Sequence, residues 1–248
     1  MLDVIRHDAV TELRLARPPV NAIDPALARE LVAQLRAAPA AGARAIVLSG
    51  QPGRFSGGLD VPALLKLDRD GIIAFWSDFF AVMATLARSP VPVVAAITGH
   101  SPAGGAVMSI FCDYRVMARG PFRIGLNEVQ VGLTVPEVIQ LAFKRLVGAH
   151  RAERLMVAGA MVEPEQALEY GMVDELTEPD NVVARALAWC DSHLKLPPLA
   201  MSATRRLARK DLADLMGEVS RFPVDDFAAS WFADETQSTL RGLFEKKR

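Results

Sequence analysis

The sequence predicts an α/β fold with a C-terminal helical extension, and three features of the chain carry this prediction. Short, continuously apolar runs of strand length alternate with helical patterns over residues 1–195, as expected of strands that helices cover on both faces. Gly-rich turns directly follow two of these runs. Beyond residue 195 the pattern is helical and is broken at prolines. We therefore expect a core of residues 1–195 and a helical region of residues 196–248.

The composition excludes several classes of function. The 248 residues, 51% of them hydrophobic, can bury a sizeable core. A net charge of −1 without basic blocks argues against nucleic acid as the main partner. No apolar run reaches the ~20 residues of a spanning helix, so we expect no membrane segment. Cys112 and Cys190 form no spaced motif, which predicts no metal site and a reducing compartment. No signal segment precedes the first strand, so the expected location is the cytoplasm.

The N-terminal elements follow from simple periodicities. Residues 4–5 and 10–15 predict two short strands joined by a tight turn. Asp24 before Pro25 is a good N-cap, and the leucines that follow predict an amphipathic helix that ends before Pro39. Residues 45–49 are continuously apolar, which predicts a strand buried on both faces.

Two Gly-rich turns stand out because each follows a buried strand. Residues 53–60 contain Gly57 and Gly58, and residues 98–106 contain Gly104 and Gly105. Adjacent glycines let the backbone approach a ligand closely. The second turn opens an apolar helix, whose first N–H groups have no partner within the helix. Taken alone, the first turn is better explained as a tight turn without a function.

Glu128 is the candidate base of the chain. It follows a predicted strand over residues 122–124, and the apolar segment over residues 129–135 holds no Lys or Arg. A carboxylate with apolar neighbours and no nearby cation has a raised pKa. The alternative is a surface Glu at a strand end. His100 has no carboxylate or nucleophile in its own segment, so we interpret it as structural.

The remaining segments are mostly helical. Residues 72–86 form a long helical pattern in which Trp76, Phe79 and Phe80 repeat at helical spacing. Further strands are predicted over residues 92–97, 114–117 and 172–176, and further helices over residues 107–112, 137–146, 151–158 and 164–170. From residue 181 onward the pattern is helical, with breaks at Pro197 and Pro223.

Several motifs in one order resemble the crotonase (enoyl-CoA hydratase/isomerase) superfamily, and the resemblance covers nearly the whole chain. It looks most like the mitochondrial-type Δ3,Δ2-enoyl-CoA isomerases. The motifs are Pro19-Val20-Asn21-Ala22, Pro52 to Asp60, Ser101 to Gly105, Cys112-Asp113-Tyr114-Arg115, Ile124 to Glu128 and Glu163 to Val173. The resemblance implies a crotonase-like ββα spiral core.

The resemblance also implies roles for residues. The N–H groups of Leu59 and Gly104 would form an oxyanion hole for a thioester carbonyl, and Glu128 would be the catalytic carboxylate. Coenzyme A would enter as part of an acyl-CoA substrate, with its adenine near the backbone of residues 55–57 and with no tightly bound cofactor. The implied substrate-binding residues are Phe55, Ser56, Gly57, Gly58, Gly105, Trp76, Phe80, Leu133 and Pro136.

Val107 separates the possible reactions. Hydratases of the superfamily carry a second catalytic glutamate at this position, and valine cannot activate water. The expected function is therefore a Δ3,Δ2-enoyl-CoA isomerase in which one Glu shuttles a proton. The alternatives are another crotonase-type acyl-CoA enzyme, such as a hydrolase or decarboxylase, or a non-catalytic acyl-CoA-binding homologue.

The C-terminal region has two further expectations. The resemblance implies a homotrimer or a dimer of trimers, with which the apolar residues of the C-terminal helices are consistent, namely Phe227, Trp231, Phe232 and Leu240. Arg241, Lys246 and Lys247 could meet the CoA phosphates, but a solvated helix end explains them better.

Overall fold

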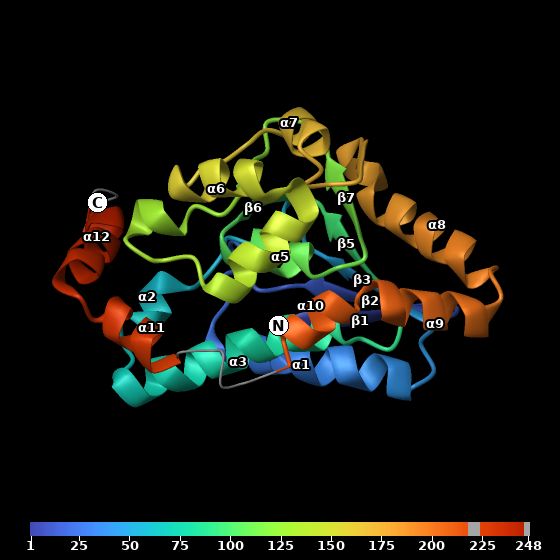
Figure 1. Cartoon of the computed structure of the whole chain (residues 1–248), viewed down its shortest axis with the longest axis horizontal. Coiled ribbons are helices and arrows are strands. Elements are labelled where there is room, and N and C mark those ends of the chain that lie inside the picture. Colours follow the sequence, from blue (N-terminus) through green and yellow to red (C-terminus); the bar gives the residue numbers. More distant parts are fainter. Residues whose placement is uncertain (218–223, 246–248) are drawn as a thin grey trace.

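A six-stranded sheet forms the centre of the computed structural model, which describes residues 1–217 and 224–245 (Figure 1). Its strand order is β1-β2-β3-β5-β7-β9, and only the β1–β2 pair is antiparallel. The strands are β1 (Leu2–His7), β2 (Val10–Leu15), β3 (Ala45–Ser49), β5 (Val93–Ile97), β7 (Tyr114–Ala118) and β9 (Glu175–Thr177).

Both faces of the central strands β3 and β5 are covered, which is why these strands are apolar and fully buried. Along β3, Ile46 and Leu48 pack into the larger core, whereas Ala45 and Val47 face α8 (Val182–Leu194). Successive side chains of a strand point to opposite faces of the sheet, so alternate residues of β3 pack into the two cores. The α/β fold with strands covered on both faces, predicted from the sequence, is confirmed, and its sheet is mostly parallel.

On the larger core, α1 (Pro25–Ala40) packs beside α3 (Arg69–Ala87). Asp24 caps α1 by accepting a hydrogen bond of 2.8 Å from the Leu27 N–H. The prediction that this helix ends before Pro39 is wrong: Pro39 lies in its last turn, where a missing N–H removes a single hydrogen bond. By length and composition α3 could cross a membrane, but half of its most apolar stretch is buried, as in a core helix.

A second, three-stranded sheet was not recognised from the sequence, although the strand predicted over residues 122–124 overlaps one of its members at Ile124. Its strands are β4 (Gly53–Arg54), β6 (Gly99–Pro102) and β8 (Ile124–Gly125), in the order β4-β6-β8. Both pairings are parallel, so the chain leaves all three strands at the same edge. The strands are too short to show a period in the sequence. This sheet brings together the two Gly-rich turns and the segment that carries Glu128.

Glycines allow these strands to lie at their observed separation. A Cβ atom added to Gly99 would lie 1.9 Å from the Gly53 carbonyl carbon, and one added to Gly125 would lie 2.1 Å from the Ala160 carbonyl oxygen. Neither backbone group can move aside as a flexible side chain would. Glycine at both positions is therefore a requirement of packing.

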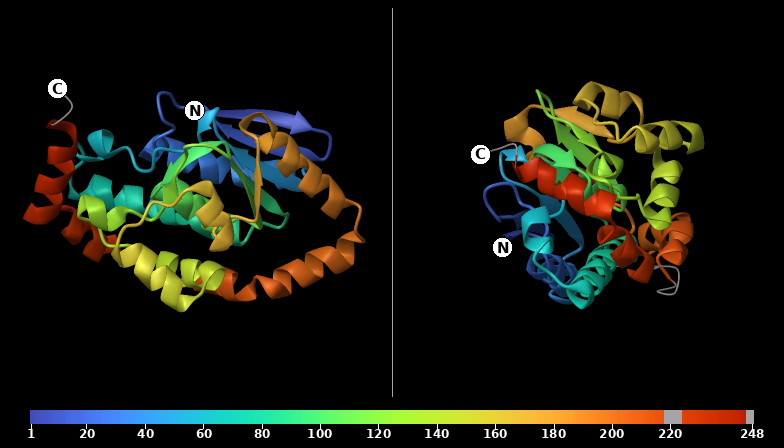
Figure 2. Two further views of the ribbon diagram at one scale, coloured as in Figure 1. Left: turned by 90° about the horizontal axis from the view of Figure 1, so that it is seen from above. Right: turned by 90° about the vertical axis from the view of Figure 1, so that its left-hand side faces the viewer.

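The other helices surround the two sheets, and the C-terminal ones follow an arc around the core (Figure 2). They are α2 (Val61–Leu64), α4 (Gly104–Ile110), the 3₁₀ turn η1 (Glu128–Val131), α5 (Glu137–Val147), α6 (Ala149–Val157), α7 (Pro164–Glu169), η2 (Pro179–Asn181), α9 (Pro198–Ala208), α10 (Lys210–Leu215), α11 (Val224–Trp231) and α12 (Asp234–Glu245).

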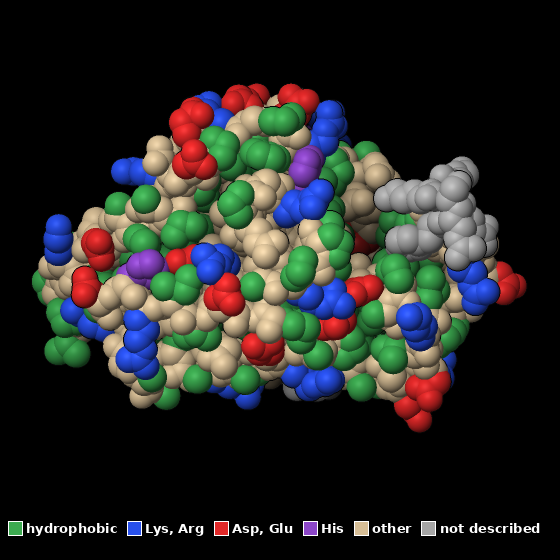
Figure 3. Space-filling model, turned by 180° about the vertical axis from the view of Figure 1, so that it is seen from behind, with side chains coloured by type: hydrophobic (Ala, Val, Ile, Leu, Met, Phe, Trp, Pro, Cys, Tyr) green, Lys and Arg blue, Asp and Glu red, His purple; other side chains and the backbone are tan. Residues whose placement is uncertain are grey.

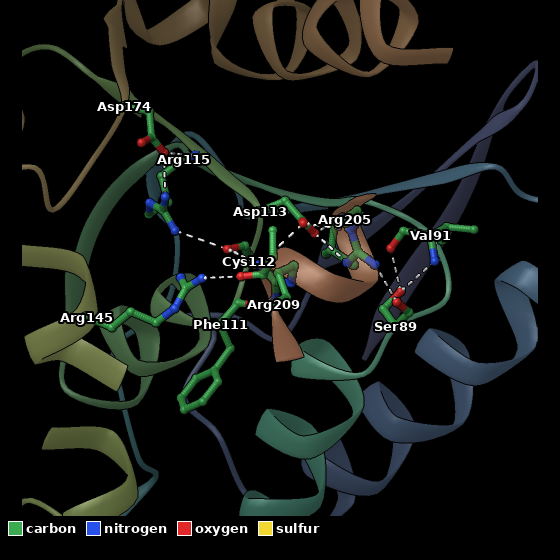
Figure 4. A network of polar contacts seen from close by, with 12 residues as sticks. Ser89, Val91, Phe111, Cys112, Asp113, Arg115, Arg145, Asp174, Arg205 and Arg209 are labelled. Carbon is green, nitrogen blue, oxygen red and sulfur yellow. Dashed lines mark hydrogen bonds and ion pairs between the residues drawn. The ribbon is translucent and has the colours of Figure 1, made fainter. Parts of the chain in front are cut away.

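Ion pairs around Asp113 attach α9 and the start of α10 to the core (Figure 4). The carboxylate accepts hydrogen bonds of 2.7 and 2.8 Å from Arg205 and one of 2.8 Å from the Val93 N–H at the start of β5. Arg209 lies 3.3 Å from the same carboxylate and donates to the Phe111 carbonyl at 2.7 Å. One Asp side chain therefore joins the central sheet to the C-terminal helices.

Some apolar residues of α11 and α12 are buried within the chain and others are exposed. Trp231 and Leu240 are 1% and 0% exposed, so the expectation that they lie at an interface is wrong for these two side chains. The Phe227 ring packs at a tilt against Trp76 and Phe80, and Phe232 remains 40% exposed. Lys246, Lys247 and Phe222 lie outside the described residues. On the face seen in Figure 3, acidic and basic side chains are interspersed with hydrophobic ones.

We expect the Gly99→Ala variant to lose about 3 kcal/mol or more of unfolding free energy, because its methyl group would overlap the Gly53 backbone. Gly242→Ala is the matched control, since Gly242 lies in α12 with no atom within 4 Å of the added Cβ. That change should stabilise the protein by ~0.5–1 kcal/mol through helix propensity. Urea denaturation of both variants measures the contrast, and equal stabilities would contradict the packing argument.

Candidate active site

The three segments that leave the edge of the small sheet line one cavity of about 220 Å³. Gly57 and Leu59 follow β4, Gly104 follows β6, and Glu128 follows β8. Apart from Asn127, apolar side chains form the rest of the wall. The remaining lining residues are Val61, Trp76, Phe79, Pro102, Ala103, Asn127, Val131, Leu133, Pro136, Ile139 and Leu243.

Glu128 is the sole acidic residue of this lining among the described parts of the chain. It begins η1 and is 8% exposed, so the alternative of a surface Glu is wrong. Its Oε2 atom has no hydrogen-bond partner within the described residues. Burial raises the pKa of the Glu128 carboxyl from 4.5 to about 7, and its own backbone N–H opposes this only in part. The raised pKa expected from the apolar surroundings is confirmed.

The Leu59 N–H points into the cavity because the peptide groups on either side of Leu59 are hydrogen-bonded to Ile23. The Ile23 N–H donates to the Gly58 carbonyl at 2.7 Å, and the Asp60 N–H donates to the Ile23 carbonyl at 2.9 Å. In such a parallel bridge the amide between the two bonded peptide groups points away from the partner strand. The Leu59 N–H accordingly has no acceptor within the described residues, and Leu59 lines the cavity.

The Gly104 N–H is the second free donor of the cavity wall. It follows Ala103, whose φ of 43° and ψ of −114° are strained for a residue with a side chain. The Ala103 N–H donates to the Gly125 carbonyl at 2.8 Å, which joins this turn to β8. A Cβ added to Gly104 would lie 3.4 Å from Leu59 Cδ2, so the two turns are in close proximity.

Aromatic residues of α3 form one apolar wall of the cavity, but they are not the two residues that were expected. Trp76 and Phe79 line the cavity, but Phe80 does not. Phe80 instead packs between Trp76 and Phe227, with ring centroids 5.9 and 5.7 Å away. Phe79 and Phe80 are adjacent in the helical pattern, and the position of α11 decides which of them faces the cavity. Sequence spacing carries no signal for that choice.

Leu133 and Pro136 line the cavity as expected, but several glycine and loop residues lie behind its wall. Ser56 is 1% exposed, and its hydroxyl donates to the Asn21 carbonyl at 2.8 Å. Phe55 is fully buried. A Cβ on Gly105 would lie 3.1 Å from Ser56 Cβ, and one on Gly58 would lie 3.2 Å from the Pro102 carbonyl. In this structure Phe55, Ser56, Gly58 and Gly105 shape the turns and do not line the cavity.

The C-terminal helix closes one end of the cavity. Leu243 of α12 belongs to the lining, and the Thr236 hydroxyl donates to the Gly132 carbonyl at 2.7 Å. Val107 is fully buried in the core behind the cavity and is not part of the lining. Sequence analysis did not identify Phe79, Asn127, Ile139 or Leu243 as lining residues. Their positions depend on how distant segments meet.

Comparisons with known proteins identify relatives of this chain in sequence and in structure. A family model described as enoyl-CoA hydratase/isomerase matches residues 6–248. The mitochondrial enoyl-CoA delta isomerase 1 of Mus musculus is 30% identical over 240 residues, 96% of this chain and 83% of that protein. A probable enoyl-CoA hydratase of Mycobacterium tuberculosis is 32% identical over 197 residues, 78% of this chain and 74% of that protein.

Among solved structures, human mitochondrial delta3-delta2-enoyl-CoA isomerase superposes with a TM-score of 0.93 at 28% sequence identity. The match covers 99% of this chain and 97% of that chain. The crotonase-like fold with C-terminal helices that was expected from the motifs is therefore confirmed.

We expect Glu128→Gln to stabilise the fold in a pH-dependent way. Because the pKa of Glu128 is higher in the folded than in the unfolded chain, ionisation favours unfolding. The wild type should lose stability relative to Glu128→Gln as the pH rises from about 4.5 to about 7, and the difference should level off above that. The variant should gain ~1–3 kcal/mol at alkaline pH. Urea denaturation across this range measures the difference, and a pH-independent gap would contradict the assignment.

Proposed function

The chain belongs to the enoyl-CoA hydratase/isomerase family, and on this premise we propose that it is a Δ3,Δ2-enoyl-CoA isomerase. The observation that carries the proposal is the content of the cavity: one buried carboxylate, two backbone N–H groups without an acceptor among the described residues, the Asn127 amide and otherwise apolar walls. An acyl-CoA thioester brings a carbonyl oxygen that the two donors can bind. Its carbon 2 loses a proton most easily when the resulting enolate is stabilised.

The reaction follows from these groups. The ionised Glu128 removes a proton from carbon 2 of a 3-enoyl-CoA, and the electron pair of that C–H bond moves toward the thioester. The oxygen becomes an oxyanion that accepts hydrogen bonds from the Leu59 and Gly104 N–H groups. Protonated Glu128 then delivers its proton to carbon 4, and the double bond forms between carbons 2 and 3. One carboxyl acts first as base and then as acid, for which a pKa near neutrality is suited.

Two features favour isomerisation over the other reactions of the family. Hydration requires a second group that handles water, and the corresponding residue is the buried Val107. Hydrolysis and decarboxylation need further polar groups, whereas the wall offers mainly apolar side chains such as Trp76 and Phe79. A non-catalytic acyl-CoA-binding role would leave the buried Glu128 and its raised pKa without a function.

The same proposal includes the cofactor and the assembly. No step requires a tightly bound cofactor, because coenzyme A enters with the substrate and the acid–base chemistry belongs to Glu128. For the assembly, a homotrimer or dimer of trimers is supported by α9, which has no buried residue. Its Leu199 and Leu207 are 87% and 69% exposed, which suits a contact between chains.

Purified protein should convert trans-3-hexenoyl-CoA to the conjugated thioester, seen as a rise in ultraviolet absorbance. Glu128→Gln should lower kcat by roughly 10²–10⁴-fold because the proton shuttle is lost. Glu137→Gln, a change on the neighbouring helix α5 outside the lining, is the control and should retain activity. Isomerase activity that survives in Glu128→Gln would contradict the role of Glu128 as the group that transfers the proton. Hydration of a 2-enoyl-CoA at a comparable rate would instead indicate that the protein is a hydratase.

The pH dependence of kcat/KM should report the ionisation of Glu128. Activity should rise with pH and level off above about 7, because only the ionised carboxyl removes the proton from carbon 2. Stability measured over the same range controls for unfolding. A profile that is flat through neutrality, in protein that remains folded, would contradict this role for Glu128.

A further inference from the structure

We propose that Arg17 and Asn21 are positioning residues that fix the direction of the Leu59 N–H. This inference deepens the proposed function and rests on it, since Leu59 is an oxyanion donor only if the cavity binds a thioester. Neither residue belongs to the cavity lining. Both act through hydrogen bonds to the residues on either side of Leu59.

Asn21 closes a turn with Arg17 before it reaches the active-site loop. The Arg17 N–H donates to Asn21 Oδ1 at 2.9 Å, and the Asn21 N–H donates to the Arg17 carbonyl at 2.7 Å. Asn21 is fully buried and has a φ of 53°, a value that asparagine tolerates better than most residues. Burying the Asn21 amide costs free energy unless its polar atoms are hydrogen-bonded, and here they are.

Asn21 then holds the segment before Leu59. Its Nδ2 atom donates to the Phe55 carbonyl at 3.1 Å, and its carbonyl accepts a hydrogen bond of 2.8 Å from the Ser56 hydroxyl. That hydroxyl in turn accepts from the Gly58 N–H at 3.2 Å. The neighbouring Val20 carbonyl accepts from the Gly57 N–H at 2.6 Å. Residues 55–57 are therefore joined to this turn by three hydrogen bonds, while the N–H groups of Phe55 and Ser56 donate to the His100 carbonyl of β6.

Arg17 holds the residue after Leu59. Its Nη2 atom lies 2.5 Å from Asp60 Oδ2 and 3.0 Å from Asp24 Oδ2, and its Nη1 atom donates to the Ala22 carbonyl at 3.0 Å. The other carboxylate oxygen of Asp60 accepts from the Ala63 N–H at 3.0 Å and caps α2. Arg17 is 23% exposed, so water screens this pair only partly.

The two sets of bonds restrain the Leu59 peptide from both sides. With residues 55–57 held by the Arg17–Asn21 turn, and Asp60 held by Arg17, the peptide plane before Leu59 cannot turn without breaking several hydrogen bonds. A backbone N–H has no side-chain rotamer that could adjust its position, so the direction of the N–H bond depends on such restraints. Misplacement by about 1 Å can lower a rate by up to roughly 10²-fold.

Arg17→Met should therefore lower kcat for the 3-enoyl-CoA by roughly 10- to 100-fold with little change in KM. Arg29→Met is the matched control, because it removes an Arg–Asp pair between α1 and α3 that touches neither turn. Asp60→Asn should have an effect similar to that of Arg17→Met, and the double variant should be no worse than either. Arg17→Lys, which keeps the charge, should recover part of kcat. Equal kcat in Arg17→Met and Arg29→Met would overturn the proposal.

Binding of acetoacetyl-CoA supplies a readout that needs no turnover. The oxyanion donors favour the enolate form of this ligand, which has its own ultraviolet absorbance. Arg17→Met should bind the ligand but show an about tenfold smaller ratio of enolate to keto form than the control at the same pH. If it does not fold, Asn21→Gly, which allows the positive φ and removes the side-chain bonds, takes its place in the same measurement.

The two proposals fail in different ways. An enolate ratio that falls in Arg17→Met but not in Arg29→Met, in protein without isomerase activity, would overturn the proposed function and support the positioning role. Isomerase activity in the wild type with an unchanged enolate ratio in both variants would overturn the positioning role and leave the function standing.

Discussion

The parallel pairing of β4, β6 and β8 is the constraint on which the rest of the site depends. These strands are only two to four residues long, yet their common direction makes three distant loops emerge at one edge. The loops deliver Leu59, Gly104 and Glu128 to one cavity. The close approach is possible because β6 and β8 carry glycine where another segment of the same chain passes, as at Gly99 and Gly125. A side chain at Gly99 would push apart β4 and β6, the two strands that lead to the donors.

Within this frame, unfavourable features are concentrated where the chemistry is proposed. Glu128 is buried without a cation, and Ala103 adopts a strained backbone. Such features persist only when the surrounding structure holds them in place. Here the restraint comes from the hydrogen bond between the Ala103 N–H and the Gly125 carbonyl of β8, and from α12, which binds the Gly132 carbonyl after Glu128. The stable six-stranded sheet and the Asp113 ion pairs lie elsewhere, where they carry no direct role in the reaction.

The sequence was informative where a physical requirement is local. Continuous apolar runs predicted β3 and β5, because a strand covered on both faces has no polar side. Asp24 and Pro25 marked the start of α1, since capping involves adjacent residues. The prediction for its end was wrong, because a proline in the last turn removes little. The small sheet escaped notice, because pairs of two residues have no period and exist only through pairing with distant segments.

For the candidate site, sequence alone determined which chemical groups are available: one carboxylate in an apolar segment, two Gly-rich turns, and valine in place of a second acid. Tertiary structure decided how they are placed. It buried Glu128, left the Leu59 N–H free by pairing its neighbours with Ile23, and turned Phe79 rather than Phe80 into the cavity. The reason is physical: burial, hydrogen-bond direction and the choice between adjacent side chains depend on segments far apart in the chain.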